Sequence, residues 1–124
     1  MYQIDNQSRT PVYEQMIKQI ENYILMGILP PEEQLPSVRN MSMELHINPN
    51  TVQKSYAELD RKGIIYSVNG VGCFVSKKAK EILHKEKRSK LNDLKPVIRE
   101  IAMSGVTQEV MIELIKSIYQ EEIK

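Results

Sequence analysis

The chain has 124 residues, of which 17 are Lys or Arg and 16 are Asp or Glu, so its formal net charge is +1. This length fits one small domain with an appendage and excludes a large enzyme. Its 41% hydrophobic content supports a compact core, but no apolar run approaches the roughly 18 residues needed to cross a bilayer. A single cysteine excludes an internal disulfide. These features predict a cytoplasmic protein that does not bind a membrane.

Charge and composition divide the chain near residue 76. Residues 1–75 carry 6 basic and 8 acidic side chains, residues 76–99 carry 9 and 3, and residues 100–124 carry 2 and 5. The composition also changes at Ser76 from turn-rich to almost wholly helix-forming. We therefore predict a first domain at residues 1–76 and a helical segment at residues 77–124.

Three helix starts are predicted in the first domain. Thr10, Ser37 and Asn48 are each expected to cap a helix, because a short polar side chain can accept a hydrogen bond from an exposed backbone N–H. Pro11 and Pro49 follow two of these caps at the first helical position, where no hydrogen bond is lost. Apolar residues then recur at helical spacing. The expected inward residues are Tyr13, Met16, Ile17, Ile20 and Ile24 in the first helix, Val38, Met41 and Leu45 in the second, and Val52, Tyr56 and Leu59 in the third.

A β-hairpin is predicted after the third helix. Two β-prone runs, Ile64–Val68 and Cys73–Val75, are joined through Asn69-Gly70, a dipeptide that tolerates the positive φ angles of a tight turn. The order of helix, helix, short turn, helix and hairpin predicts a mainly α fold, the winged helix-turn-helix. Such a fold presents the polar start of its third helix to the major groove of DNA.

Four stretches carry a family resemblance: Gly27-Ile28-Leu29, Gln34-Leu35-Pro36-Ser37-Val38-Arg39, Ile47–Tyr56 and Asn69–Val75. They closely resemble the DNA-binding domain of GntR-family bacterial transcription regulators over residues 8–76. The short segment after it resembles the YtrA subfamily. The resemblance implies a sequence-specific DNA-binding transcription regulator, most simply a repressor of a nearby transporter operon. It also implies operator contacts at Ser37, Arg39, Asn48, Asn50, Thr51, Gln53, Lys54 and Gly70.

The chemistry of these residues agrees with that role but leaves alternatives open. Arg39 can pair bidentately with guanine or clamp a phosphate, or it can form a surface ion pair with Glu44 or Asp60. The alternative role of Asn48 is to cap the helix without touching DNA. The alternative for Gln53 and Lys54 is that they belong to a solvated helix face. Many family members carry Arg where this chain has Pro49 and Gln53, so its base preferences need not follow theirs. Because residues 1–75 are net acidic, the hypothesis requires four cations to face DNA and four carboxylates to face away: Arg39, Lys54, Arg61 and Lys62 against Glu14, Glu21, Glu32 and Glu33.

Other chemistry finds little support in the sequence. His46 and His84 are isolated, so no metal site is expected, and no catalytic constellation or phosphate-binding loop occurs. We therefore expect neither an enzyme nor a cofactor. Cys73 is expected to be a small buried strand residue. The basic run from Lys77 to Lys90 is either a solvated helix face or a set of flanking phosphate contacts.

The segment after residue 76 predicts two helices that need a partner. Pro96 is expected to kink or break the first, Ser104-Gly105 to end it, and Thr107 to cap the second. The apolar faces are too broad for two helices to bury on each other, which predicts a homodimer; packing back onto the first domain is the alternative. The predicted dimerisation residues are Leu91, Leu94, Ile98, Ile101, Leu114, Ile115 and Ile118.

Two other classes of function compete with operator binding. One is a winged-helix module whose third helix binds a protein, and the other is a ligand or redox sensor that uses Cys73 or a pocket between helices. A protein contact would need exposed Leu, Phe or Met on the third helix, whereas its outward residues are polar. DNA binding is therefore favoured, and the effector, if one acts, is unknown.

Overall fold

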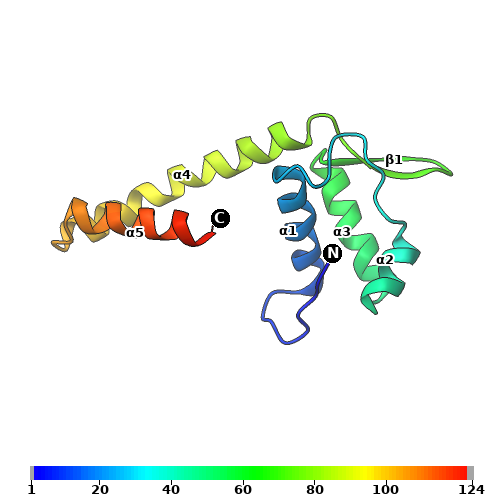
Figure 1. Cartoon of the computed structure of the whole chain (residues 1–124), viewed down its shortest axis with the longest axis horizontal. Helices are drawn as coiled ribbons and strands as arrows, with labels where there is room; N and C mark the ends of the chain where they lie inside the picture. Colours follow the sequence, from blue (N-terminus) through cyan, green and yellow to red (C-terminus); the bar gives the residue numbers. More distant parts are fainter. Residues whose placement is uncertain (1, 123–124) are drawn as a thin grey trace. The chain divides into compact units, whose positions relative to one another are not determined.

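In this computed structural model, residues 2–122 are described and form five helices and one two-stranded antiparallel sheet (Figure 1). The chain divides into two compact units, unit 1 at Met1–Glu86 and unit 2 at Lys87–Lys124. This composition confirms the mainly α winged-helix prediction. The elements are α1 (Val12–Leu25), α2 (Val38–Leu45), α3 (Pro49–Arg61), β1 (Ile65–Val68), β2 (Gly72–Val75), α4 (Ala79–Met103) and α5 (Gln108–Glu122).

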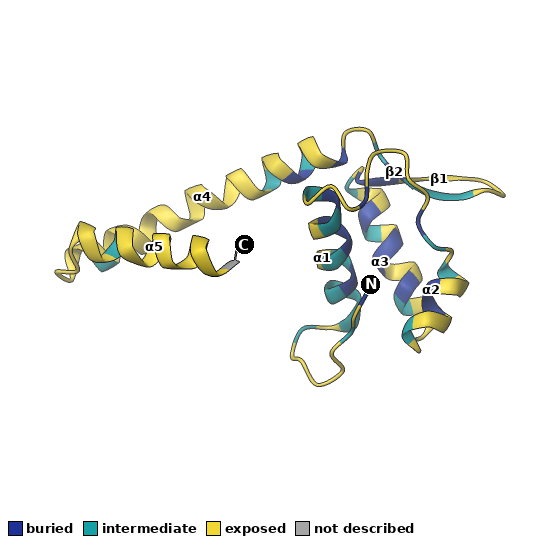
Figure 2. Ribbon diagram, viewed as in Figure 1, coloured by how far each residue is buried: buried dark blue, intermediate teal, exposed yellow. Residues whose placement is uncertain are grey.

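The core of unit 1 lies where α1 and α2 pack against α3 (Figure 2). It includes most of the residues that the helical spacing predicted to face inward, among them Met16, Ile20 and Val52, each at most 1% exposed. Four other predicted inward residues are only half-buried: Tyr13, Ile17, Val38 and Leu45. Ala79 and Leu83 from the first turns of α4 belong to the same core, at 1% and 0% exposure. Unit 1 therefore runs past the predicted boundary at residue 76, because these two side chains complete its packing.

Two of the three predicted helix caps are confirmed. Ser37 Oγ accepts a hydrogen bond from the backbone N–H of Asn40 at 3.1 Å, and Asn48 Oδ1 accepts one from Asn50 at 2.8 Å. The prediction for Thr10 is wrong, because Pro11 itself occupies the cap position of α1 and no side chain bonds there.

The side chain of Gln15 bonds to the segment that precedes α1, although it does not cap an N–H of the helix. Its Nε2 donates to the carbonyls of Asp5 and Thr10, each at 2.9 Å, and its Oε1 accepts from the N–H of Asp5 at 2.9 Å. A side chain of α1 therefore holds the preceding segment against the first turns of the helix.

In the hairpin β1 begins one residue later and β2 one residue earlier than predicted, and the turn differs from the prediction. β1 and β2 pair from Ile65↔Val75 to Val68↔Gly72. The N–H of Val71 donates to the carbonyl of Val68 at 3.0 Å, and Gly70 has a φ of +76°. Asn69 keeps a negative φ, so the turn has the geometry of type II and not the two positive φ angles expected of Asn-Gly.

Residues 32–35 run beside β2 and extend the small sheet. The N–H of Leu35 donates to the carbonyl of Cys73 at 2.8 Å, and the N–H of Val75 donates to Glu33 at 2.9 Å. Leu35 is 2% exposed, so the core holds this segment in place. Because α2 follows directly, the segment links the hairpin to the start of α2.

Unit 2 contains most of α4 and all of α5. α4 has no break at Pro96, since loss of one backbone donor leaves the rest of the helical bonds in place. It ends before Gly105, which has a φ of +98°, and Thr107 Oγ1 accepts from the N–H of Val110 at 3.4 Å, as predicted. Among residues 2–122, no helix has the length and apolar character to cross a membrane.

The predicted dimerisation residues are largely exposed in this single chain. Leu91 is 62% exposed and Ile98 is 41% exposed, with the other exposed members between these values, while Ile101 is half-buried. Burial of such side chains is worth roughly 1.5–3 kcal/mol each before ordering costs. The exposed members of the set are Leu91, Leu94, Ile98, Leu114, Ile115 and Ile118.

Candidate nucleic-acid interface

The start of α3 presents a polar face to solvent. Asn50, Gln53 and Lys54 are exposed and Thr51 is half-buried. The opposite face of α3 is buried, which fixes the rotation of the helix. Two side chains on that face add hydrogen bonds to neighbouring segments: Ser55 Oγ donates to the carbonyl of Tyr13 at 3.0 Å, and the hydroxyl of Tyr56 donates to that of Pro36 at 2.7 Å.

Arg39 lies exposed on the first turn of α2, next to the Ser37 cap. Within residues 2–122 its guanidinium forms no ion pair or side-chain hydrogen bond, so the alternative pairing with Glu44 or Asp60 does not occur. Asp60 instead accepts a hydrogen bond from Ser67 Oγ at 3.2 Å. The guanidinium is therefore available to a phosphate or to the edge of a guanine.

Lys54 lies over an aromatic ring. Its Nζ is 3.8 Å from the centroid of Tyr13, whose hydroxyl donates to Glu14 Oε1 at 3.2 Å. That hydrogen bond, and the charge of Glu14, raise the pKa of the Tyr13 phenol. A cation–π contact at an exposed site is worth only about 0.5–1 kcal/mol. The ring therefore orients the ammonium group without preventing its exchange onto a phosphate.

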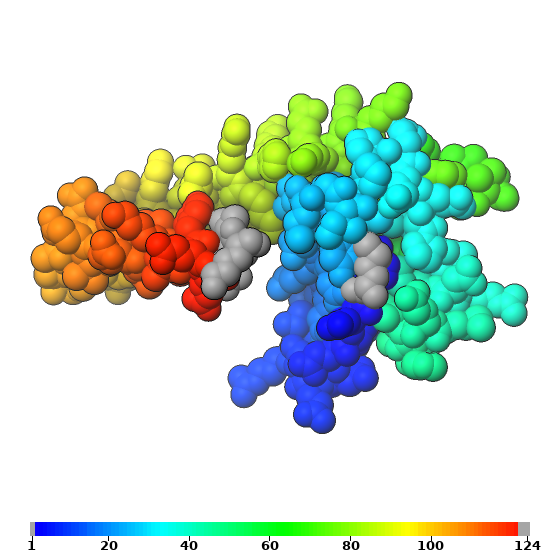
Figure 3. All heavy atoms as spheres, viewed as in Figure 1, coloured from blue at the N-terminus to red at the C-terminus, as the bar shows by residue number. Residues whose placement is uncertain are grey.

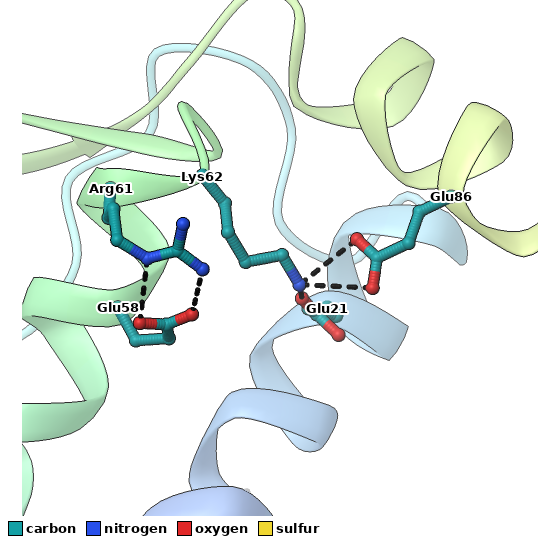
Figure 4. Close-up of polar contacts among 5 residues, drawn as sticks. All are labelled: Glu21, Glu58, Arg61, Lys62 and Glu86. Carbon is teal, nitrogen blue, oxygen red and sulfur yellow. Dashed lines mark hydrogen bonds and ion pairs between the residues drawn. The ribbon is translucent and has the colours of Figure 1, made fainter.

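Two of the four cations expected to face DNA are engaged elsewhere (Figure 4). Arg61 pairs with Glu58 on the same helix, with Nε 3.0 Å from Oε2. Lys62 turns inward, and its Nζ lies 2.6 Å from Glu21 and 3.0 Å from Glu86. The expectation that Lys62 faces DNA is therefore wrong.

Glu21, the partner of Lys62, is buried and does not face solvent. Glu21 is 5% exposed, so its side chain is almost wholly buried. Burial opposes the charge on Lys62, but hydrogen bonds to Glu21 and Glu86 outweigh it and raise the pKa of Lys62. One acidic and one basic group are thus removed together from the surface of unit 1, which leaves Arg39 and Lys54 as the exposed cations of α2 and the start of α3.

The wing tip combines an open glycine with a bracing side chain. A Cβ on Gly70 would meet no atom within 4 Å, so the tip is free to approach another molecule. Gln34 Nε2 donates to the carbonyl of Val71 at 2.9 Å. No role of its own is predicted for Gln34 from the sequence. The one sequence signal for this contact is Gly72, a second glycine directly after the turn, which leaves room for the Gln34 amide.

Figures 1 and 3 show where the elements that carry these residues lie in unit 1. α2 lies next to the start of α3, and the hairpin extends beyond the other end of α3 (Figure 1). α2 and the hairpin both lie along the right-hand edge of the unit in Figure 3. Eight predicted contact residues thus come from three places in one compact unit: Ser37 and Arg39 on α2, Asn48, Asn50, Thr51, Gln53 and Lys54 at the start of α3, and Gly70 on the wing.

The lone cysteine is less buried than predicted. Cys73 is half-buried on β2, with Sγ 3.4 Å from Ser67 Oγ. Among residues 2–122, no group of three His, Cys, Asp or Glu side chains is placed to hold a metal ion.

Comparison with known proteins identifies relatives along the whole chain. Residues 12–75 match the model of the family described as "Bacterial regulatory proteins, gntR family". The HTH-type transcriptional repressor YtrA of Bacillus subtilis is 43% identical over 119 residues, which cover 95% of this chain and 92% of that protein.

Solved structures show the same similarity. A GntR family transcriptional regulator from Listeria monocytogenes aligns with a TM-score of 0.73 and 30% identity, covering 92% of this chain and 98% of that one. AraR(DBD), solved in complex with operator ORE1, aligns with a TM-score of 0.53 and 25% identity over 61% of this chain and 93% of its own.

Proposed function

Because the chain belongs to the gntR family of bacterial regulatory proteins, which are DNA-binding transcription regulators and not enzymes, we propose that it is a homodimeric repressor that binds operator DNA through unit 1. The similar YtrA is named a repressor, and its similarity covers both units of this chain. We further propose that the protein is cytoplasmic and represses a nearby operon. The resemblance to the YtrA subfamily suggests that this operon encodes a transporter.

The observation that carries this proposal is the exposed, polar start of α3 beside an unpaired Arg39. Gln53 is suited to the N6 and N7 atoms of adenine, and Arg39 to guanine or a phosphate. The side chains of Asn50 and Thr51 lie at the start of a helix, where the helix dipole favours a phosphate, and Lys54 offers a positive charge to the same kind of group. Ser37 and Asn48 use their side chains as caps, so they hold these helix starts in the shape that DNA would meet.

The homodimer is proposed from the exposed apolar face of unit 2. A two-fold pair of winged helices reads an inverted repeat, with one half-site for each unit 1. AraR(DBD), which has a similar fold, was solved in complex with an operator, and this supports operator DNA as the target of unit 1. The contacts between copies would be made by the predicted set: Leu91, Leu94, Ile98, Ile101, Leu114, Ile115 and Ile118.

The proposal is tested by selecting duplexes from a random library with the full chain and then measuring a gel shift with the selected sequence. DNA upstream of the protein's own gene serves as a second probe. We expect enrichment of an inverted repeat and a retarded complex that competitor DNA of random sequence does not remove. A chain that enriches no sequence and retards no duplex at low salt would contradict operator binding and favour a protein-binding wing.

A further inference from the structure

The wing tip is a three-residue connection closed by a backbone hydrogen bond. Asn69, Gly70 and Val71 join the paired residues Val68 and Gly72. The N–H of Val71 donates to the carbonyl of Val68 at 3.0 Å, and Gly70, with a φ of +76°, has no side chain that could pack against the hairpin. A contact from outside the hairpin therefore adds to what holds the tip.

Gln34 supplies that support from a fixed backbone. Its Nε2 donates to the carbonyl of Val71 at 2.9 Å. The Gln34 backbone lies in the segment that pairs with β2, where it forms a bridge with Phe74, and the adjoining Leu35 is anchored in the core. The side chain therefore reaches the tip from a segment that the core holds in place.

Gly72 gives the amide of Gln34 its room. A Cβ at Gly72 would lie 2.6 Å from Gln34 Nε2, and the φ of +141° also disfavours a side chain there. Real Cβ atoms do not approach a neighbour so closely, so any other residue at this position would displace the amide. Gly72 and Gln34 therefore act together to hold the carbonyl of Val71.

We propose that Gln34 is a positioning residue for operator binding, which holds the wing tip through Val71 and so fixes Gly70 relative to the start of α2. The same segment continues through Pro36 into the Ser37 cap, so one stretch of backbone carries both the wing support and the helix of Arg39. The inference rests on the proposed function, since it concerns how unit 1 presents two of its DNA contacts.

The first test uses Gln34→Met, which keeps the length and neutrality of the side chain but removes the donor. The probe is a fluorescein-labelled duplex of the sequence that the parent chain selects, read by anisotropy. Affinity should fall about 3- to 10-fold, the size expected for loss of one hydrogen bond. The urea midpoint should not change, because Gln34 is exposed. The 15N order parameter of Gly70 should decrease. Gln7→Met, at an exposed glutamine before α1, is the matched control and should change none of these quantities.

Two double-variant cycles separate positioning from general stability. Gly72→Ala should lower operator affinity in the parent but cost less in a Gln34→Ala background, where no amide is displaced. Gln34→Met should cost nothing further in a Gly70→Val background, because the wing contact is already lost.

The inference is overturned if Gln34→Met binds within twofold of the parent, if its loss persists in full with Gly70→Val, or if the urea midpoint falls along with affinity. These outcomes are distinct from failure of the proposed function. A parent chain that selects no duplex would overturn operator binding itself, whereas a parent that binds as tightly as Gln34→Met would overturn only the role of Gln34.

Discussion

At the scale of single residues, the unpaired guanidinium of Arg39 gives the sharpest test of the interface. We predict that Arg39→Ala weakens operator binding by roughly 1–3 kcal/mol, as for loss of a base contact, with an unchanged circular dichroism spectrum. Lys54→Ala should instead weaken operator and random DNA equally and lower the salt slope by about 1. Anisotropy measurements with operator and random duplexes at several salt concentrations test both variants. Lys18→Ala, an exposed cation on α1, is the control, and an Arg39→Ala variant with parental affinity would remove Arg39 from the interface.

Tyr2 provides a test of the core that is independent of DNA. Its side chain is 8% exposed, and its hydroxyl has no hydrogen-bond partner among the described residues. Tyr2→Phe should therefore be neutral or stabilise the fold by up to about 1 kcal/mol at pH 7. Tyr56→Phe is the matched control, because it removes the hydrogen bond to Pro36 and should destabilise by about 1 kcal/mol. Urea unfolding of both variants measures the difference.

The same residue predicts the alkaline limit of stability. Burial, reinforced by the charges of nearby groups, raises the pKa of Tyr2 from 10.0 to about 12. The unfolded chain therefore releases this proton first, so stability is fully present below pH 10 and is lost as the pH rises toward 12. Tyr2→Phe should flatten that fall. An unfolding free energy that declines between pH 10 and 12 as steeply in the variant as in the parent would assign the decline to other groups.

At the scale of elements, a comparison of two glycines of similar conformation separates the effect of the wing on DNA binding from its effect on stability. Gly70 and Gly27 have φ angles of +76° and +81°, and a Cβ at either would meet no atom within 4 Å. Gly70→Val and Gly27→Val should therefore cost similar stability through backbone strain alone, on the order of 1–3 kcal/mol each. Only Gly70→Val should also lower operator affinity. Equal affinities for the two variants, measured where both are folded, would show that the wing does not touch DNA.

The buried end of α3 is held by charge in addition to apolar contacts. Lys62→Met leaves the carboxylate of Glu21 buried without its counter-charge and should destabilise the fold by about 3 kcal/mol. Adding Glu21→Gln should recover part of that loss. Arg61→Met breaks a neighbouring pair that lies in solvent and should change the urea midpoint little. If the two single variants were equally mild, Lys62 would not hold α1, α3 and α4 together.

Local rules predicted most elements because the deciding signal lay within a few residues. Ser37 and Asn48 cap their helices through neighbours two or three positions away, and Val52 and Leu59 follow helical spacing. The failures involve partners that no local rule supplies. Thr10 does not cap α1, and its carbonyl instead accepts a hydrogen bond from Gln15. Glu21 draws Lys62 inward from 41 residues away. The bracing of Val71 by Gln34 spans 37 residues and could not be read from either sequence segment.

At the scale of the whole molecule, α4 belongs to both units. Its first turns complete the core of unit 1 through Ala79 and Leu83, and its later turns carry part of the apolar set assigned to the dimer, the rest of which lies on α5. The composition change at Ser76 marked the start of helix-forming sequence but not the end of the core. Composition records secondary-structure preference, whereas a domain boundary depends on which side chains are buried.

This division predicts where the chain can be cut. A chain ending at Ser76 loses Leu83, whose burial is worth roughly 1.5–3 kcal/mol, and should be clearly less stable than a chain ending at Glu86. Composition alone predicts a stable domain that ends at residue 76. Urea unfolding of the two truncations decides the point, and equal midpoints would show that the first turns of α4 are dispensable.

The longer truncation also isolates the role of the dimer. Residues 1–86 should be monomeric and bind the inverted repeat at least about a hundredfold more weakly than the full chain, because the second half-site no longer contributes. In the full chain, Leu94→Glu and Ile118→Glu should each produce monomers by placing a charge in the apolar face. Met103→Glu is the control, since Met103 is 88% exposed at the end of α4 and lies outside the predicted set. Sedimentation at micromolar concentration measures the association. A monomeric parent would refute the homodimer, and a truncation that binds as tightly as the parent would show that a single unit 1 accounts for operator recognition.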